Sequence, residues 1–467
     1  MKENIKSFLQ VISANLFVML VGIIQSLLLP QKIGPEQYGF WSLYLLYIGY
    51  AGFFNLGIPD GIYLCFAGKK YKDLDKKKFR SYLNISSIIS LIFLIIWIII
   101  ILIEDMEEHF KLIMILIGVS SFFACINNFV TMLDQATARF NIYSTGRIIE
   151  KCCIIFGILF YFIFNLETAI VIIIFSVLGK IITCLFYLYN TKPILVEKSV
   201  SYKDEIKDIL YFMKIGLWLT LSSIGISTIN SIGRFFIQYN MNVTALGQYS
   251  FIFSIAGLFT LFFSAVATVL FPMLKKSSDN NIGEIDVIMN ICGLAIYLCI
   301  GPLYIFLNMF YKDYSPSFDC LVVMLSSVAL LGKISIVYST IFKMINRVKE
   351  YVIILIISII ICLIITYLTV KLDNSIFSIA IASYFSLMIL CILSVKKYNS
   401  YNRDKLQYGF FYYLVAFVYF ILKIICSTRI FFVSLYVSLI LCLMIVIYRE
   451  RMCVLKFVNI LNPKGGK

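Results

Sequence analysis

Long apolar runs alternate with short polar connections along the whole chain. The runs are roughly 20 residues long, which is the length that an α-helix needs to cross the hydrocarbon core of a bilayer. Strands of a membrane barrel would instead show about 10 residues of alternating polarity, and the chain has no such alternation. The pattern predicts fourteen membrane-spanning helices, at 8–29, 40–66, 82–103, 112–133, 147–165, 168–190, 213–238, 247–272, 287–308, 320–342, 352–371, 376–395, 409–427 and 430–448.

The connections group these spans into two bundles. The longest connection, 191–212, is predicted to be a cytoplasmic linker that lies at the membrane interface. It separates an N-terminal six-helix bundle at 1–190 from a C-terminal six-helix bundle at 213–395, and 396–467 should add two transmembrane helices and a basic cytoplasmic tail. We therefore expect an all-α, polytopic integral membrane protein with about 14 transmembrane helices.

A short motif repeats near the start of each predicted bundle. Gln37-Tyr38 lies between the first two spans, and Gln248-Tyr249 lies 211 residues later, between the seventh and eighth. Because both connections have the same predicted orientation, an axis along the membrane normal would relate the two bundles. Transporters built from such repeats hold their substrate between the repeats.

A polar stripe runs through residues 214–238 of the seventh predicted span. Its polar residues recur every three or four positions, which places them on one helical face. They are Thr220, Ser223, Ser227, Asn230, Ser231, Arg234 and Gln238. An arginine inside such a span must face protein or a water-filled cavity. The first span has Asn15, Gly22 and Gln25 at similar spacing, so both helices are expected to line a transport path; polar contacts between helices are the alternative.

Composition supports the membrane assignment and charge orients it. The chain is 61% hydrophobic and 14% charged, with a mean hydropathy of +0.94, whereas soluble proteins have about 25% charged residues. With the N-terminus inside, 31 of the 40 Lys and Arg residues fall on the inner side and 5 on the outer side. Because cytoplasmic flanks retain positive charge, both termini should be cytoplasmic. The net charge of +15 then reflects topology and the lipid bilayer as partner, not nucleic acid.

Three cations lie deep inside predicted spans, whereas a fourth, Lys423, lies close to a membrane surface. Lys180 and Lys333 are near the centres of the sixth and tenth spans, and Arg234 is in the outer half of the seventh. Each costs about 2.5–3.5 kcal/mol on insertion scales, and a cationic cleft suits a diphosphate. Backbone or serine contacts for the lysines, and an arginine that reaches the outer surface, are the alternatives. The predicted substrate-binding residues are Arg234, Lys180, Lys333, Asn230, Ser227, Gln238, Asn15 and Gln25.

Acidic residues are rare in the predicted spans, which disfavours a carrier of cationic drugs. Apart from Glu150 at the inner start of the fifth span, Asp60 is the one acid placed in a span, and a count at about 1.5 Å per residue from Phe40 puts it near the inner surface. Arg139, Arg147 and Glu150 surround the inner start of the fifth span, as a headgroup-access patch or as topology signals. If a proton or sodium gradient drives transport, Asp60 and Glu150 are the candidates for ion coupling.

The sequence excludes several other chemistries. It has one histidine, His109, and its 13 cysteines form no C-x-x-C motif, so we expect no metal site. It has no phosphate-binding G-x-x-x-x-G-K-S/T loop. We therefore expect no catalytic residues, no cofactor and no enzymatic activity.

Three segments carry a family resemblance: IGPEQYG at 33–39, NLGIPDGI at 55–62 and LFPMLK at 270–275. Together with the chain length, span count and repeat, they resemble polysaccharide flippases of the Wzx type. These belong to the exporter superfamily that includes multidrug and toxic-compound extruders and lipid II flippases. This sequence departs from the family at Gly233, because members often have an acidic residue there, before the arginine of the seventh span.

The resemblance implies a function. The protein would move an undecaprenyl-diphosphate-linked oligosaccharide from the inner to the outer leaflet of the bacterial cytoplasmic membrane, by alternating access, for surface polysaccharides such as O-antigen. Its partners would be this polyprenyl-diphosphate-linked glycan, a glycan polymerase and chain-length machinery. A lipid II flippase or a multidrug extruder of the same superfamily is the alternative. A membrane glycan polymerase is a further alternative, which the short outer loops disfavour.

Overall fold

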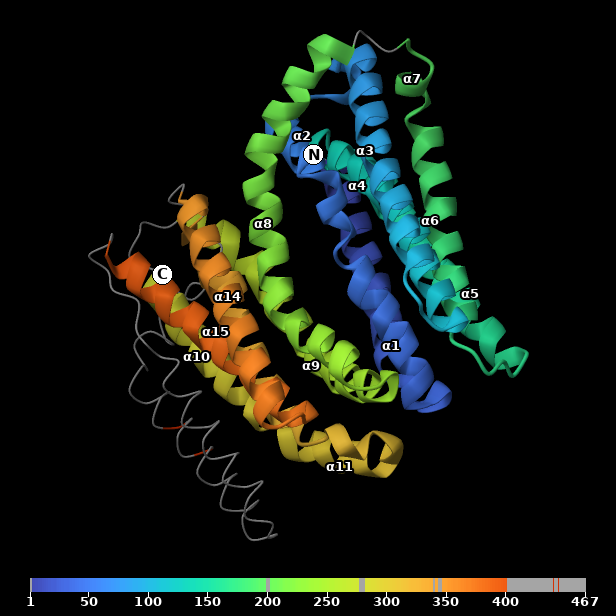
Figure 1. Cartoon of the computed structure of the whole chain (residues 1–467). Helices are drawn as coiled ribbons and strands as arrows, with labels where there is room; N and C mark the ends of the chain where they lie inside the picture. The colour runs from blue at the N-terminus through green and yellow to red at the C-terminus, as the bar shows by residue number, and fades with distance from the viewer. Residues whose placement is uncertain are drawn as a thin grey trace. The chain divides into compact units, whose positions relative to one another are not determined.

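The computed structural model describes residues 2–198, 202–276, 282–338, 341–342, 347–400, 440 and 444. These residues form helices joined by short connections and contain no β-strand (Figure 1). The all-α prediction is therefore confirmed. The spans predicted at 409–427 and 430–448, with the basic tail, lie outside the described residues except for 440 and 444.

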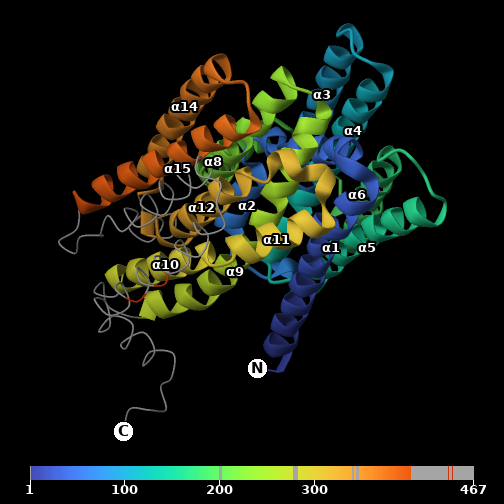
Figure 2. The same cartoon turned by 90° about the horizontal axis from the view of Figure 1, so that it is seen from below.

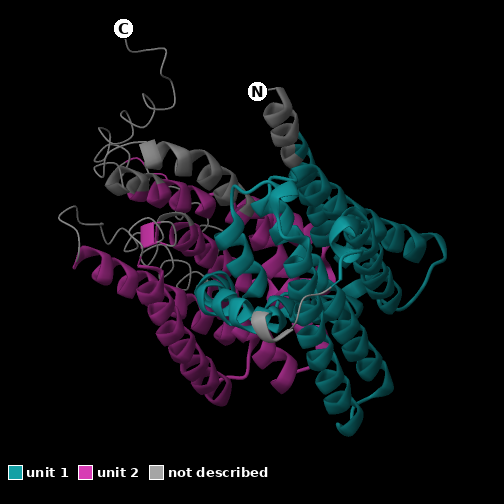
Figure 3. Ribbon diagram, turned by 90° about the horizontal axis from the view of Figure 1, so that it is seen from above, with its two compact units in different colours: residues 1–224 teal, residues 225–467 magenta. Residues whose placement is uncertain are grey.

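The chain forms two compact units, residues 1–224 and 225–467, and the boundary falls inside one long helix (Figure 3). The first unit contains α1 (Lys2–Ile48), η1 (Ala51–Asn55), α2 (Ile58–Phe66), η2 (Tyr71–Asp73), α3 (Lys76–Ile103), α4 (Glu108–Ala136), α5 (Phe140–Ile163), α6 (Ile170–Asn190), α7 (Lys192–Leu195) and the first half of α8 (Tyr202–Asn240). The second contains the rest of α8, α9 (Val243–Lys276), α10 (Ile282–Tyr297), α11 (Ile300–Phe310), η4 (Lys312–Ser317), α12 (Cys320–Lys333), η5 (Ile334–Tyr338), α14 (Val348–Leu372) and α15 (Ile376–Asn399).

Several helices match the membrane in length and polarity. Eight in the described part of the chain are long and apolar enough to cross a bilayer, or nine if the bent pair Met289–Tyr297 and Ile300–Phe310 is one span. Helices α3 and α14 leave rows of large apolar side chains exposed, Ile95 and Ile360 among them, at 49% and 52%. Such faces are stable in contact with lipid. The protein is thus a multi-pass membrane protein, and the count of fourteen spans stays a prediction.

The predicted loop between the first two spans is a kink within α1. Gly34 has φ 75° and ψ 168° inside the otherwise helical range Lys2–Ile48, a conformation that is essentially restricted to glycine. Pro35 follows, and a proline disfavours helical geometry at the residue before it. The Gly-Pro pair therefore breaks the helix at a single residue, and the residues after it, which we expected to be a loop, are helical.

We expect Gly34→Ala to lower the free energy of unfolding by about 1–3 kcal/mol, because alanine is strained at this φ and ψ. Thermal unfolding of the purified protein in detergent measures the loss. Gly22→Ala in the same helix is the control, because an added Cβ at Gly22 would meet no atom within 4 Å. Equal unfolding temperatures for the two variants would contradict the assignment of strain to Gly34.

The second predicted span, 40–66, is interrupted. Helix α1 ends at Ile48, the 3-10 turn η1 follows, and Leu56 and Gly57 have positive φ values of 50° and 78° before α2 begins. Pro59 lies in the first turn of α2, where proline is favoured. The count of helical rise from Phe40 to Asp60 therefore does not hold, and Asp60 belongs to the first turn of a separate short helix.

Glycines bring the backbones of α2 and α8 into contact in the first unit. A Cβ on Gly216 would lie 2.0 Å from the Gly57 carbonyl oxygen and 2.5 Å from the Gly61 nitrogen. A Cβ on Gly61 would lie 2.2 Å from the carbonyl oxygen of Phe212. Any side chain at these positions would separate the two helices.

Each unit also contains a closely packed helix pair. Helices α5 and α6 lie side by side in the first unit, and α14 and α15 lie side by side in the second, as Figures 1 and 2 both show. Helix α12 packs against α9, α10 and α15 within the second unit. These contacts place the charged side chains described next.

Candidate transport sites in the two units

Charged side chains gather in the first unit where α5 meets α1 and α6. Lys180 Nζ on α6 donates a hydrogen bond to Glu150 Oε1 on α5, at 2.5 Å. Arg147, one turn earlier on α5, donates from Nη1 to Asn15 Oδ1 on α1, at 2.7 Å. Lys151 lies within electrostatic range of the other three charged groups. We call Arg147, Glu150, Lys151 and Lys180 the basic cluster. The two hydrogen bonds also bring together four residues that the sequence predicted for the site: Lys180 with Glu150, and Arg147 with Asn15.

Close approach of two helices makes the ion pair possible. A Cβ on Gly179 would lie 3.0 Å from Cys153 Cβ and 3.1 Å from the Glu150 carbonyl oxygen. Helix α6 therefore lies directly against the turn of α5 that carries Glu150. Lys180 is ten residues from each end of α6, or about 15 Å at the helical rise. The ammonium is thus attached near the middle of a membrane-spanning helix.

The basic cluster has an excess of positive charge and is partly open. It contains three cations and one carboxylate, so its formal charge is +2. The side chains of Lys180 and Glu150 keep 12% and 26% of their surface exposed, and Arg147 and Lys151 are half-buried. One carboxylate does not neutralise three cations, and an anionic group that enters this space would be attracted at short range in a low dielectric.

Polar contacts hold the middle of α6 next to this cluster. The Tyr44 hydroxyl on α1 lies 2.7 Å from Ser120 Oγ and 3.0 Å from Ser176 Oγ. Ser176 is one turn before Lys180, and Asn127 on α4 donates a hydrogen bond to the Lys180 carbonyl oxygen at 3.0 Å. Helices α1, α4 and α6 are therefore joined at the level of Lys180.

Arg139 belongs to a different set of contacts. Its Nε lies 3.3 Å from Asp134 Oδ1, whose side chain is fully buried, and its Nη2 donates to the Asn190 carbonyl oxygen at 3.0 Å. Its guanidinium lies 3.9 Å from the centre of the Tyr71 ring, and burial raises the pKa of the Tyr71 hydroxyl. Arg139 thus ties together the end of α4, the start of α5 and the end of α6.

Two further predicted residues of the first unit lie in separate places. Asp60 accepts a hydrogen bond from the Thr220 hydroxyl on α8, beside the contact of Gly57 with Gly216. Gln25 is 9% exposed, and its Nε2 has no hydrogen-bond partner among the described residues.

In the second unit, Arg234 on α8 lies against an aromatic ring. Its Nη2 donates to Ser231 Oγ at 2.8 Å, and its guanidinium carbon lies 4.3 Å from the centre of the Phe253 ring on α9. A guanidinium can stack on an aromatic face and donate hydrogen bonds in its own plane at the same time. Of the remaining predicted residues on α8, Ser227 is exposed and Gln238 is half-buried.

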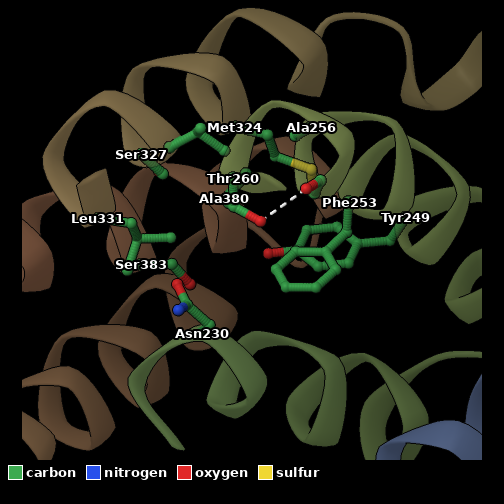
Figure 4. Close-up of a pocket in the computed structure, with 12 residues that line it drawn as sticks. Asn230, Tyr249, Phe253, Ala256, Thr260, Met324, Ser327, Leu331, Ala380 and Ser383 are labelled. Atoms are coloured by element: carbon green, nitrogen blue, oxygen red, sulfur yellow. Dashed lines mark hydrogen bonds between the residues drawn. The ribbon is translucent and has the colours of Figure 1, made fainter. Parts of the chain in front are cut away.

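A pocket opens beside Arg234. Asn230, Ser383 and Leu331 lie on one side of it, and the rings of Tyr249 and Phe253 lie on the other (Figure 4). The rest of its lining is Ala256, Gly257, Thr260, Met324, Ser327, Val328 and Ala380. Because Phe253 both lines the pocket and carries the guanidinium of Arg234, the pocket combines aromatic faces, hydroxyl groups and a nearby cation.

Gly233 is enclosed by neighbouring helices. A Cβ at this position would lie 3.0 Å from Tyr249 Oη and Ile379 Cγ2, and 3.1 Å from Ser383 Oγ. The acidic side chain that the sequence resemblance leads us to expect here would need these side chains to move. The glycine is therefore explained by the close packing of α8 against α9 and α15.

Lys333 is more deeply buried than Lys180 and Arg234, the other two cations predicted deep inside spans. Its Nζ lies 2.9 Å from Asp286 Oδ1 and donates to Asn290 Oδ1 at 3.1 Å. The side chains of Lys333 and Asp286 are 0% and 1% exposed. Lys333 thus differs from the partly exposed Lys180.

The sequence reasoning missed Lys151 and Asp286. Lys151 follows Glu150 directly in the sequence, and the prediction named Arg139, Arg147 and Glu150 without it. Asp286 lies at the end of the polar connection before the ninth predicted span, one residue outside that span. Its spacing of four from Asn290 places the two on one helical face, which is the signal that could have found it.

Comparisons with known proteins agree with this architecture. Residues 5–278 match the family described as polysaccharide biosynthesis protein. A search of curated proteins gives no match. Similar solved structures include an inward-facing multidrug resistance MATE family transporter of the MOP superfamily, which is 16% identical to this chain. The aligned region covers 83% of this chain and 94% of the transporter, with a TM-score of 0.58. A MATE structure in complex with MaD3S is 14% identical, with 85% and 96% covered and a TM-score of 0.53.

The fold is similar to that of the solved MATE-family structures. Because the family match extends over more than half of its length, the chain belongs to the polysaccharide biosynthesis protein family. The predicted resemblance to flippases of this superfamily is confirmed.

Proposed function

We propose that the protein translocates a polyprenyl-diphosphate-linked oligosaccharide, with undecaprenyl as the lipid, from the inner to the outer leaflet of a bacterial cytoplasmic membrane. Transport would proceed by alternating access, with both termini cytoplasmic, and would supply a glycan polymerase and its chain-length machinery on the outer side. The observation that carries the proposal is the basic cluster of the first unit, with its excess of two positive charges.

A diphosphate fits this cluster chemically. The planar guanidinium of Arg147 can donate two parallel hydrogen bonds to phosphate oxygens, whereas Lys151 and Lys180 act as point charges that follow the phosphates. Glu150 holds Lys180 in place when no anion is bound. A diphosphate that binds would compete with Glu150 for the ammonium, and the partial exposure of the pair permits this exchange.

A cationic drug fits the described sites poorly. Such a ligand requires carboxylates that can face it, but Glu150, Asp134 and Asp286 are each ion-paired with a cation of the protein, and Asp60 accepts a hydrogen bond from Thr220. A lipid II flippase would use the same diphosphate chemistry as the proposed substrate, so the sugar portion distinguishes these two functions.

The pocket of the second unit suits a glycan. Aromatic faces such as those of Tyr249 and Phe253 stack on sugar rings, and Asn230, Thr260, Ser327 and Ser383 offer hydrogen-bonding groups. We assign Asn230 and Arg234 to contacts with the substrate in this unit. Asn15, Gln25, Ser227 and Gln238 stay predicted contacts.

Reconstitution in liposomes tests the proposal. The probe is undecaprenyl diphosphate linked to a fluorescent N-acetylglucosamine, and a membrane-impermeant quencher reports which leaflet holds it. We expect the wild type to accelerate translocation over empty liposomes, and Arg147→Gln to slow it by about 10- to 100-fold, because a hydrogen bond to a charged group contributes about 1.5–3 kcal/mol.

Arg347→Gln is the matched control, because Arg347 forms a partly exposed ion pair with Glu350 on α14, 2.7 Å long, and should leave the rate unchanged. Fluorescent lipid II is the second substrate. Faster movement of lipid II than of the N-acetylglucosamine lipid would favour the lipid II function, and no acceleration of either lipid would contradict the proposal.

A further inference from the structure

The ion pair between Asp286 and Lys333 is enclosed within the second unit. Asp286 and Asn290 lie one turn apart on α10, and both contact the Lys333 ammonium at the end of α12. The two charged side chains have 0% and 1% exposure. A bulky diphosphate therefore has no access to Lys333 in this arrangement, in contrast to Lys180.

Few other titratable groups face the pair. Among the described residues these are Tyr338 on η5, whose ring centre lies 5.9 Å from Lys333 Nζ, and Cys391 on α15, which lies within electrostatic range of both charges. The carboxylate of Asp286 and the ammonium of Lys333 are thus the two charges that balance each other here.

The backbone next to Lys333 is unusual. Helix α12 ends at Lys333, and η5, Ile334–Tyr338, continues as a π-helical turn. Such turns insert one extra residue into a helix, are rare, and occur mostly at functional sites. Conversion of this turn to α-helix would shift the register by one residue and rotate Lys333 relative to the residues that follow. The pair is therefore attached to a segment whose backbone departs from α-helical geometry.

Proton binding would change the stability of this arrangement. A buried ion pair is stable while both partners are charged, and removal of one charge leaves the other uncompensated in a low dielectric. When a proton from water binds the Asp286 carboxylate, the carboxylate becomes neutral and its ion pair with the ammonium is lost. The ammonium is then stable only where it reaches water or another anion, which requires α12 and η5 to move.

A metal cation fits this place less well than a proton. The Lys333 ammonium is already 2.9 Å from Asp286 Oδ1, where a bound cation would have to lie. Sodium would also need several oxygen ligands, whereas Asp286 and Asn290 are the two residues that supply side-chain oxygens to the ammonium. The chemistry of the pair thus selects a proton as its ligand.

We propose that Asp286, paired with Lys333, is the proton-binding site that couples transport to a proton gradient, with η5 as the segment that changes conformation. This inference rests on the proposed transport function. It differs from the sequence-based expectation, which gave Asp60 and Glu150 as coupling candidates. Each cycle would bind one proton at Asp286 from one side of the membrane and release it to the other.

Transport against a concentration difference tests the coupling. Liposomes carry the wild type or the double variant Asp286→Leu with Lys333→Met, which removes both charges and leaves none unpaired. With one proton per cycle, a pH difference of one unit should drive up to a tenfold enrichment of the fluorescent N-acetylglucosamine lipid in one leaflet by the wild type. The double variant should equilibrate the probe with no enrichment. If the double variant enriches the probe as much as the wild type does, the proposal is overturned.

A second measurement does not depend on transport. Infrared difference spectra of the purified protein between neutral and acidic pH report carboxyl groups that gain a proton. We expect one protonated-carboxyl band to be present in the wild type and in Glu350→Gln and absent from Asp286→Asn. Glu350→Gln can in addition lack a band of its own, which belongs to Glu350. Identical spectra for the wild type and Asp286→Asn would overturn the proton site. A wild type that fails to move the probe but shows the Asp286 band would instead contradict the proposed substrate.

Discussion

Replacing Lys180 with methionine is expected to slow translocation of the diphosphate-linked probe by about 10- to 100-fold, because a contact with a charged group contributes about 1.5–3 kcal/mol. Glu150→Gln is expected to keep the rate at the wild-type level or above it. This change leaves the ammonium of Lys180 in place and raises the formal charge of the basic cluster from +2 to +3. The liposome assay with the fluorescent N-acetylglucosamine lipid measures both variants.

The asymmetry between these two variants is the informative result. If the ion pair only joins α5 to α6, loss of either partner breaks the same contact, 2.5 Å long, and both variants should be impaired equally. Thermal unfolding in detergent controls for stability, because the pair is mostly buried, with side chains 12% and 26% exposed, and its loss can destabilise the fold. Equal loss of transport in the two variants would contradict a ligand role for Lys180.

Gly216→Ala is expected to destabilise the first unit by about 3 kcal/mol or more, at the upper end of the range for overpacked cores. The added Cβ would lie 2.0 Å from the Gly57 carbonyl oxygen and 2.5 Å from the Gly61 nitrogen. Both are backbone atoms, so relief requires separation of α2 from α8, which would also weaken the hydrogen bond between Thr220 and Asp60. Membrane abundance and thermal unfolding in detergent measure the effect.

Gly225→Ala in the same helix is the matched control. Its Cβ would meet the flexible Leu355 side chain, with Cδ1 at 3.2 Å, and that side chain can change rotamer. We expect this variant to unfold within a few degrees of the wild type. A Gly216→Ala protein as stable as Gly225→Ala would show that α2 and α8 separate without cost.

Much of the fold could be predicted because hydropathy and length determine which segments enter a bilayer. The positions where helices are kinked or interrupted could not be predicted in this way. The kink at Gly34 and the interruption at Leu56 and Gly57 depend on the backbone conformation of single residues. An averaged hydropathy pattern continues through them, so the span at 40–66 looked continuous and the helix after Gly34 looked like a loop.

In the candidate sites, single charged residues could be predicted from the sequence around them, but their contacts with residues distant in the sequence could not. Lys180 and Glu150 could each be selected because a charge inside an apolar span is costly. Their pairing could not, because it depends on how closely α5 and α6 pack at Gly179. Asn15 and Arg147 are 132 residues apart in the chain, and no local pattern joins them. Lys333 was selected without its partner, since Asp286 fell in a predicted connection.

The interrupted second span has an electrostatic consequence. Because α2 begins at Ile58, its unpaired amide groups and the positive end of its macrodipole lie next to Asp60 in the first turn. The backbone and the Thr220 hydroxyl can therefore balance this carboxylate. A cation of the protein is not needed for that purpose. Compensation for the Asp60 carboxylate thus comes from α2 and α8 themselves.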